Sequence, residues 1–580
     1  MVPVSVSERR SDARGYRLLA LALILTALVY AATVRFQFVY DDNPQIVSNP
    51  TLTTWKTLPT LFVSHNWKFL LPDWPGNYYR PLFMTWLLVN RMLFGLNPAY
   101  WHATTVLLHL LATAMAFFVA RQWLHNGVGA GFVALLFGLH PIHVESVAWV
   151  SGVTDPLMAV FAFAAFWAWV KGERAEIGKI FWKALAIVFY AAACLSKESA
   201  VFLPVVVVVY DVLFGREERS WKGLIQSTLR SWPLWLTALA YLIVRRLVLK
   251  GFAHSLEAPI IENLLTIPTI MWGYMRRLAW PVNLSVFYDT PPVTNVLQWR
   301  FWLPTLAWIL ALLIGWRIAK RSRVVALSLL WIFIFLTPAI MGLPVFPIGE
   351  WVHDRYLYLP SFGFCVLLVH AISQLPSERE LFRLPAAPAA VVLVLVAAMA
   401  YTTGVETTYW TNGLVLFARG SKIAPHSAIA KSQLGNELYR RGDGKGAEEE
   451  YEKAIQLEPR NWKINMAYGL LLFYTGQFDR ADRQMDRAIS ILNTDPNEYF
   501  YQGLSRFKIG KFVEAEESFR NAIRTGANRV RYHFWLGVAL ERQGRLDEAK
   551  TEYEEELRQH PETDTPVRQH LEALQKLRAQ

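Results

Sequence analysis

The sequence has few charged residues and almost no cysteine. Charged residues make up 18% of its 580 residues, and Cys194 and Cys365 are its only cysteines. A soluble protein of this length usually carries about 25% charged residues, so a wholly soluble chain is excluded. Both cysteines fall inside apolar segments, which excludes a scaffold held together by disulfide bonds.

Apolar residues are correspondingly abundant. Hydrophobic residues make up 54% of the chain, and the mean hydropathy is +0.24. Long apolar blocks fill residues 16–404, whereas residues 428–580 have the composition of a soluble helical domain. The net charge of +12 lies mainly in short loops between apolar blocks, which indicates membrane orientation and not nucleic-acid binding. We therefore predict an all-α protein with a multi-span membrane domain over residues 1–404.

The apolar blocks give about eleven candidate spans, because a span needs about 20 apolar residues to cross the hydrocarbon. They lie near residues 16–38, 103–121, 128–144, 155–171, 182–197, 199–214, 232–250, 302–318, 324–341, 356–374 and 388–404. The first block lacks a small-residue cleavage site, so we interpret it as a retained span. The amphipathic segment 263–281 carries Arg276 and Arg277 and is expected to lie at the interface or to re-enter the membrane.

Lysine and arginine in the short loops predict the orientation of these spans. The basic loops are the N-terminal arginines, residues 171–183, residues 215–231 and the cluster from Arg317 to Arg323. With these in the cytoplasm, eleven crossings place the C-terminal domain on the other side, whereas an even number would leave it in the cytoplasm. The predicted external loops are residues 39–102, 144–154, 251–301 and 342–355. This predicts a bacterial inner-membrane protein with a periplasmic C-terminal domain, or a lumenal one in a eukaryotic endoplasmic reticulum.

A 34-residue repeat dominates the C-terminal domain. Its period is set by Gly435, Gly469, Gly503 and Gly537, and again by Ala447, Ala481, Ala515 and Ala549. Small residues are needed where paired helices cross closely, and the pattern resembles the tetratricopeptide repeat. We expect four repeats at 428–461, 462–495, 496–529 and 530–563, a linker at 405–427 and a capping helix at 564–580. Tyr439, Phe473 and Phe507 occupy equivalent positions and either pack between helices or form a peptide-binding groove.

Two adjacent carboxylates, Asp41 and Asp42, directly follow the first span. One of them could act as a general base towards an acceptor hydroxyl, and its neighbour could raise its pKa. Alternatively, the pair closes an Asx-type turn or caps the span.

Other ionisable residues are predicted on the same side of the membrane, where charge close to hydrocarbon is costly and often functional. They are Arg80, His140, His143, Glu145, Asp155, Lys197, Glu198, His353, Asp354 and Arg355. The sequence HPIHVE offers two imidazoles and a carboxylate that could bind a divalent cation, although it matches no specific zinc signature. Alternatively, these side chains shape the site or bind substrate hydroxyls.

Several blocks occur together and in a fixed order. They are Tyr40-Asp41-Asp42, YYRPL at 78–82, LHPIHVESVAWVSGVTDPL at 139–157, LSKES at 195–199, HDRYLYLPS at 353–361 and the repeats. In this combination the chain resembles the transmembrane and tetratricopeptide repeat-containing O-mannosyltransferases and their bacterial relatives, in the C-type glycosyltransferase (GT-C) superfamily. The resemblance covers essentially the whole chain.

The resemblance implies a membrane glycosyltransferase that moves a mannose-like sugar from a polyprenyl-phosphate donor to hydroxyl groups of exported proteins. It assigns catalysis to Asp41 and Asp42, with Asp41 preferred as the base, and donor-phosphate binding to Arg355, with Lys197 adding charge. The repeats would recruit the acceptor protein, and membrane lipids surround the spans. Two alternatives are a non-catalytic scaffold for an envelope or secretion complex and a GT-C enzyme acting on a glycan or lipid acceptor.

Overall fold

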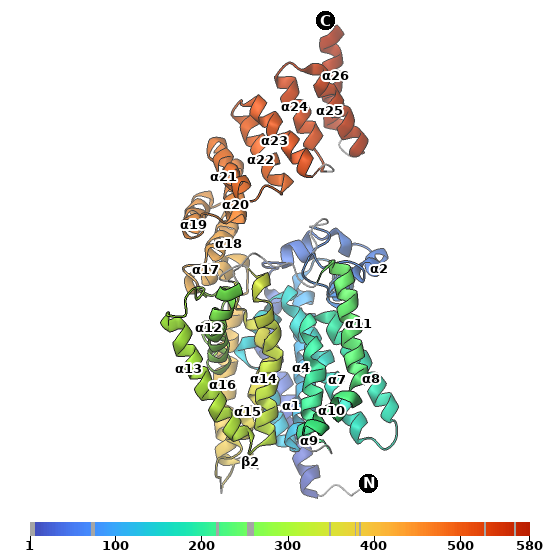
Figure 1. Ribbon diagram of the computed structural model, residues 1–580, viewed down its shortest axis with the longest axis vertical. Helices are drawn as coiled ribbons and strands as arrows, with labels where there is room; N and C mark the ends of the chain where they lie inside the picture. Colours follow the sequence, from blue (N-terminus) through green and yellow to red (C-terminus); the bar gives the residue numbers. More distant parts are fainter. Residues whose placement is uncertain are drawn as a thin grey trace. The chain divides into compact units, whose positions relative to one another are not determined.

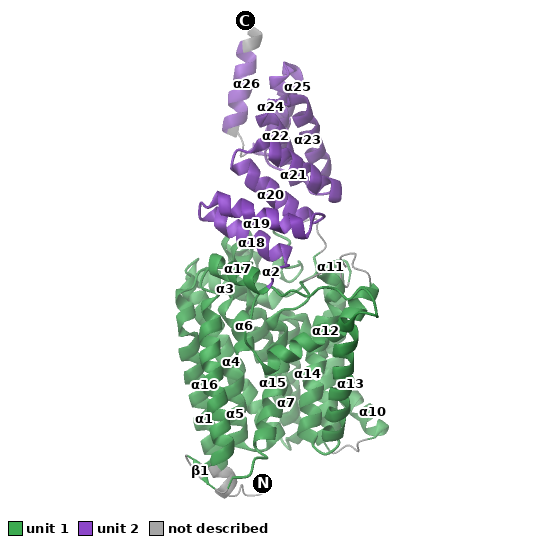
Figure 2. Ribbon diagram, turned by 90° about the vertical axis from the view of Figure 1, so that its left-hand side faces the viewer, with its two compact units in different colours: residues 1–423 green, residues 424–580 purple. Residues whose placement is uncertain are grey.

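The computed structural model describes residues 6–70, 76–215, 220–251, 260–346, 350–377, 379–381, 384–526, 529–561 and 564–579. The chain divides into a membrane unit, Met1–Ile423, and a repeat unit, Ala424–Gln580 (Figure 2). The expected all-α class is confirmed. Within the described residues, strand pairing is limited to the two-residue segments β1 (Glu380–Leu381) and β2 (Leu384–Pro385).

The membrane unit is a bundle of long helices joined by short ones (Figure 1). Its helices are α1 (Val6–Tyr30), α2 (Leu58–Leu61), α3 (Pro81–Phe94), α4 (Pro98–Leu124), α5 (Gly127–Gly138), α6 (Val144–Ala148), α7 (Thr154–Arg174), α8 (Lys179–Ser196), α9 (Leu203–Phe214), α10 (Trp221–Arg230), α11 (Trp232–Leu249), α12 (Ile260–Ala279), α13 (Trp299–Ala319), α14 (Arg323–Met341), α15 (Tyr358–Ile372), α16 (Ala386–Thr408) and α17 (Gly413–Ile423).

Nine helices in the described part of the chain are long and apolar enough to cross a membrane, and a bent pair would make ten. The bent pair is α5 with the segment Pro141–Ala148, which turn by 51° at a break where Pro141 cannot continue the helix. The expected span at 199–214 is outside this set, because α9 has 12 residues and follows a five-residue 3-10 turn. The count is therefore lower than the eleven expected.

Helix α12 is also outside the set of candidate spans within the described residues. It has 20 residues with Pro268 in its interior, Glu262 in its first turn, and Arg276 and Arg277 in its last turn. Its interfacial or re-entrant placement stays a prediction.

Several ion pairs lie at the end of the membrane unit where α1 begins. The start of α1, α10 and the β1–β2 hairpin lie at one end (Figures 1 and 2). At this end Arg121 pairs with Asp12, and Lys183 pairs with Glu173. Basic residues of α4 and α8 therefore lie at the end where α1 begins, and the chain after the other end of α1 carries Asp41.

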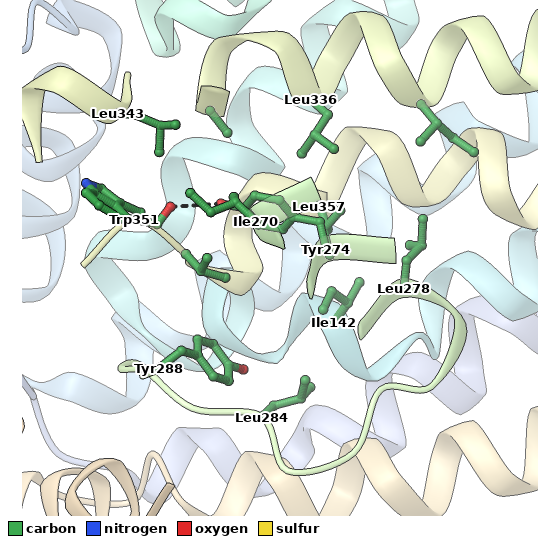
Figure 3. Packing of buried hydrophobic residues seen from close by; sticks show 13 residues of the cluster. Ile142, Ile270, Tyr274, Leu278, Leu284, Tyr288, Leu336, Leu343, Trp351 and Leu357 are labelled. Atoms are coloured by element: carbon green, nitrogen blue, oxygen red, sulfur yellow. Dashed lines mark hydrogen bonds between the residues drawn. The ribbon is translucent and has the colours of Figure 1, made fainter. Parts of the chain in front are cut away.

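A hydrophobic cluster packs residues 284–288 and 351–357 against the helix bundle (Figure 3). Tyr274 and Leu278 from α12 and Leu336 from α14 meet Trp351 and Leu357 in the segment that carries the HDR motif. The Tyr274 hydroxyl donates to the Trp351 carbonyl at 3.2 Å. This buried cluster fixes the backbone of residues 351–357.

The segment expected to be a linker, residues 405–427, is largely part of the membrane unit. Helix α16 continues to Thr408, and α17 ends at Ile423, the last residue of that unit. The backbone N–H of Gln37 donates to the Thr411 carbonyl at 3.0 Å, which joins the exits of α1 and α16. The Phe417 ring of α17 contributes to this packing through its contacts with Tyr40 and Phe287.

The repeat unit consists of consecutive helix pairs. Its helices are α18 (Ala428–Arg440), α19 (Gly444–Leu457), α20 (Trp462–Tyr474), α21 (Phe478–Ile491), α22 (Pro496–Lys508), α23 (Phe512–Thr525), α24 (Tyr532–Arg542), α25 (Leu546–Gln559) and α26 (Asp564–Ala579). A Cβ atom at Gly503 would lie 2.7 Å from the Phe519 ring, which explains the repeated glycine at this crossing.

Polar contacts also recur at the period of the repeat. Gln477 donates to Glu448 at 3.0 Å, and Arg545 donates to Glu516 at 2.8 Å. Each contact joins one repeat to the next, so neighbouring repeats stabilise one another.

The three predicted groove aromatics differ in exposure. The ring of Phe473 packs against Tyr501 with centroids 5.7 Å apart, and the ring of Phe507 packs against Trp535 at 5.6 Å. Tyr439 is 37% exposed. The contacts of Phe473 and Phe507 favour the packing role, and a peptide groove stays a prediction.

Candidate active site

A tight turn presents Asp41 and Asp42 at the end of the first span. The Asp42 N–H donates to the Val39 carbonyl at 3.0 Å, and Tyr40 has a φ of +53°, an uncommon conformation for a residue with a side chain. The Tyr40 ring packs against Trp149 at 5.6 Å and against Phe417 of α17 at 5.8 Å. These contacts hold the turn in place.

Asp42 anchors this turn. Its side chain is fully buried, and one carboxylate oxygen accepts from the Ser151 N–H at 2.8 Å and the Ser151 hydroxyl at 2.6 Å. Its other oxygen accepts from the Val39 N–H at 3.1 Å. Burial raises the pKa of Asp42 to about 7 against the opposing effect of these hydrogen bonds. Asp42 therefore joins the turn to the 3-10 turn Val150–Val153.

Asp41 is different, because its half-buried carboxylate accepts no hydrogen bond from any residue that the structure describes. Burial raises the pKa of Asp41 to about 6, and the positive charge of Arg355 opposes this shift. A carboxylate with both oxygens open and a pKa near neutrality has the properties that a general base requires.

Arg355 is held by Glu145. The Glu145 side chain is buried in α6, and its carboxylate accepts from the Arg355 backbone N–H at 3.0 Å and pairs with the guanidinium Nη1. The Nε and Nη2 atoms of Arg355 have no acceptor among the described residues. Arginine offers five N–H donors, so this side chain is oriented by one carboxylate and open to a second anion.

Two further ion pairs join distant segments of the site. The Lys197 ammonium donates to both oxygens of Asp155, at 2.6 and 2.7 Å, and both side chains are buried. Arg80 forms a bidentate pair with Glu198, at 2.8 and 2.5 Å. Against the raising effect of burial, Arg80 lowers the pKa of Glu198 to about 2.

The three cations Arg80, Lys197 and Arg355 lie close together. The Tyr356 ring lies between two of them, with the Lys197 ammonium 5.3 Å and the Arg355 guanidinium 5.2 Å from its centre. Burial lowers the pKa of Lys197, Arg80 and Arg355 lower it further, and Asp155 opposes the shift. The structure thus brings together the basic residues that the sequence predicted on one side.

The neighbouring residues of the HDR motif are buried. Burial lowers the pKa of His353, and Arg355 and Lys197 add to the shift, so this imidazole is neutral. Asp354 accepts from the Tyr288 hydroxyl at 2.7 Å and lies 3.8 Å from Arg277 Nε. Both side chains are buried beside Arg355, and the contacts of Asp354 are with the protein interior.

The histidines of the HPIHVE motif are engaged within the protein. His140 Nε2 lies 3.1 Å from the Leu278 carbonyl, and its Nδ1 accepts from the Ile142 N–H at 3.2 Å. His143 Nε2 lies 2.8 Å from the Ser361 hydroxyl. Among the described residues no group of three or more His, Cys, Asp or Glu side chains is arranged to hold a metal ion. The motif thus positions Glu145, and divalent-cation binding stays untested.

Sequence reasoning missed several residues of the site. Ser151, Trp149 and Tyr356 contact the predicted residues but lie in motifs where only ionisable side chains were considered. Glu406, which pairs with Arg419 at 3.4 Å, could have been found as an acid near the end of an apolar span.

Comparison with known proteins places this site in context. The tetratricopeptide repeat family matches residues 432–496 and 501–562. Protein O-mannosyl-transferase TMTC1 of Homo sapiens is 27% identical over 75% of this chain and 54% of its own length. A protein O-mannosyl-transferase of Caenorhabditis elegans is 26% identical over 78% of this chain and 64% of its own length. The chain is thus similar to the TMTC protein O-mannosyl-transferases over about three quarters of its length.

The chain spans about half the length of the human relative that it matches. A crystal structure of MamA matches 26% of this chain and 88% of its own chain, with 20% identity and a TM-score of 0.25. The predicted resemblance to the O-mannosyltransferases is confirmed by the relatives, and the tetratricopeptide repeats by the family match.

Proposed function

We propose that this protein is a membrane glycosyltransferase that moves a mannose-like sugar from a polyprenyl-phosphate donor to hydroxyl groups of exported proteins. The observation that carries the proposal is the open carboxylate of Asp41 beside the guanidinium of Arg355. Two nitrogens of this guanidinium, Nε and Nη2, have no acceptor among the described residues. The names of the relatives support transfer of mannose to protein.

The two residues supply complementary roles in one displacement. The acceptor hydroxyl oxygen attacks the anomeric carbon, while the bond from that carbon to the phosphate oxygen breaks and its electrons stay on the phosphate. Asp41 takes the hydroxyl proton. Arg355 stabilises the departing phosphate, since a guanidinium matches phosphate oxygens and stays charged. Attack opposite to the leaving group would invert the anomeric configuration.

Arg80 and Lys197 are assigned supporting roles in donor binding. Arg80 is already paired with Glu198 and Lys197 with Asp155, so neither cation is unpaired before the donor phosphate binds. Their combined field next to Arg355 would lower the cost of bringing an anion into a half-buried site.

The orientation of the membrane unit follows from its basic end. Because Arg121, Lys171 and Arg174 lie at the end that holds the N-terminus, we place that end in the cytoplasm. The site and the exit of α16 then lie outside, in the periplasm of a bacterium or the lumen of a eukaryotic endoplasmic reticulum. The repeats follow α17 in the chain and would recruit the acceptor protein.

Sugar transfer by the purified full chain in nanodiscs tests the proposal. With labelled polyprenyl-phosphate mannose as donor and an extract of envelope proteins as acceptor, label should move onto protein. A chain truncated after Ile423 keeps the whole membrane unit, including α17, and should still bind the donor lipid but lose at least tenfold in protein labelling.

The truncation also separates the alternatives. Label on glycan or lipid, unaffected by truncation, would contradict the protein acceptor. No transfer from any of several sugar donors by a folded chain would favour the scaffold function instead.

The pKa of Asp41 predicts a pH profile for transfer. The base must be deprotonated, and its pKa of about 6 makes it mostly so at neutral pH. The transfer rate should be nearly constant above about pH 7 and fall about tenfold by about pH 5. Initial rates with saturating donor measure this, with protein stability followed over the same range. A flat profile with the protein folded throughout would contradict Asp41 as the base.

A further inference from the structure

The membrane unit contains a cavity at the end opposite to Asp41. It has a volume of about 660 Å³ and lies between the first turns of α1 and α8 and the last turns of α4 and α7. Its walls are formed by Ser11, Asp12, Phe118, Arg121, Gln122, His125, Gly127, Trp167, Lys171, Arg174, Ala175 and Trp182. The proposed glycosyl transfer uses none of these residues.

Positive charge dominates this cavity. Arg121 pairs with Asp12 and donates to the Tyr16 hydroxyl at 3.0 Å, and Arg174 donates to the Tyr210 hydroxyl at 2.7 Å. Asp12 is the acid that lines the wall, against three cations.

Lys171, like Arg174, is paired with no acid among the described residues, whereas Arg121 is paired with Asp12. The Lys171 ammonium lies 4.7 Å from the centre of the Trp167 ring and 4.8 Å from that of Trp182. Two indole rings thus hold the ammonium at the cavity wall, where it is available to an anion.

An apolar surface continues from the cavity along α8. Next to Trp182, Phe181 is 62% exposed and Ile180 is 86% exposed. About two turns further along α8, Val188 is 62% exposed. In a span these exposed side chains meet lipid acyl chains. A cationic cavity at the end of such a face has the form of a headgroup site with its acyl chains alongside.

Basic residues in the last turns of α4 and α7 also have a simpler explanation, because cations there complement the helix dipole and set membrane orientation. That explanation accounts for the charge but not for a cavity walled by indole rings. It also predicts that every basic residue at this end contributes equally to the binding of an anionic lipid, whether or not it lines the cavity.

We propose that this cavity binds the phosphate-bearing headgroup of an anionic phospholipid in the leaflet opposite to the active site. Arg121 and Lys171 contact the phosphate, and Trp167 and Trp182 lie at the level of the glycerol backbone. Basic pockets between spans on this side of a membrane are suited to such headgroups.

Native mass spectrometry of the full chain in detergent tests the proposal, with phosphatidylglycerol, phosphatidylcholine or inorganic phosphate added separately. Phosphatidylglycerol should bind most tightly. The Lys171→Gln variant should bind it about fivefold more weakly, since each cation near an anionic headgroup contributes about 1 kcal/mol.

Lys179→Gln is the matched control, because Lys179 is exposed at the same end but does not line the cavity. It should leave phosphatidylglycerol binding unchanged. Equal weakening by both variants would overturn the proposal in favour of diffuse attraction, and so would equal binding of phosphatidylcholine. Displacement of the lipid by millimolar inorganic phosphate would show a free-phosphate site and also overturn it. Unchanged thermal midpoints without lipid confirm that both variants fold.

Discussion

The Asp41→Asn variant is expected to lose sugar transfer by about a thousandfold while folding at least as stably as the wild type, because burial disfavours the charge of the Asp41 carboxylate. General base catalysis contributes roughly 10²–10⁴-fold, and asparagine cannot take the acceptor proton. The fold should tolerate the change because the Asp41 carboxylate accepts no hydrogen bond within the described structure. Initial transfer rates and a thermal midpoint, both measured in nanodiscs, check the two halves of this result.

Asp42→Asn is the matched control. Asp42 accepts three hydrogen bonds, one from the Val39 N–H on one oxygen and two from Ser151 on the other. The NH₂ group of asparagine would face either the Val39 N–H or the two donors of Ser151, and it cannot accept from them. A buried donor left without a partner costs about 1–3 kcal/mol, so this variant should lose stability and, through the displaced turn, activity. Normal transfer by Asp41→Asn would sink the assignment of the base. Loss of transfer by Asp42→Asn alone, at full stability, would give that role to Asp42.

Asp155→Ala should destabilise the membrane unit more than any exposed ion-pair variant. The Lys197 ammonium would stay buried without its counter-charge, since the two side chains have relative exposures of 3% and 4%. Removing one partner of such a pair typically costs about 3–5 kcal/mol. The thermal midpoint of the membrane unit measures this loss.

The double variant Asp155→Leu/Lys197→Met is the control for this effect. It removes both charges and fills similar volume, so most of the lost stability should return. If Asp155→Ala melts like the wild type, the pair is not the buried contact described above. If the double variant is as unstable as the single one, packing and not charge sets the cost.

Repeating patterns made the repeat unit and most spans predictable. The 34-residue spacing of glycine and alanine follows from helix crossings that recur in every repeat, and hydropathy finds a span without knowledge of its neighbours. The hydropathy pattern failed where a helix is interrupted. Pro141 bends the expected span at 128–144, and α9 is shorter than the expected span at 199–214.

The sequence did not allow a prediction of which side chains pair within the site. The residues of the Arg80–Glu198 pair are 118 positions apart, and those of the Asp42–Ser151 contact are 109 apart. Motifs identified the ionisable residues, but which acid neutralises which base depends on how the segments between the helices pack. The different environments of Asp41 and Asp42, adjacent and identical in type, show this most clearly.

The scarcity of cysteine has a practical consequence for these experiments. Cys194 and Cys365 are fully buried in the membrane unit, and the sequence has no other thiol. A dye that fluoresces on reaction with thiols therefore stays dark until this unit opens. A measurement of total helix content would not separate the opening of the membrane unit from the melting of the repeats. The repeats unfold one after another as the contacts between neighbours break. The unlabelled natural chain thus carries two reporters of the unit that holds Asp41 and Asp155.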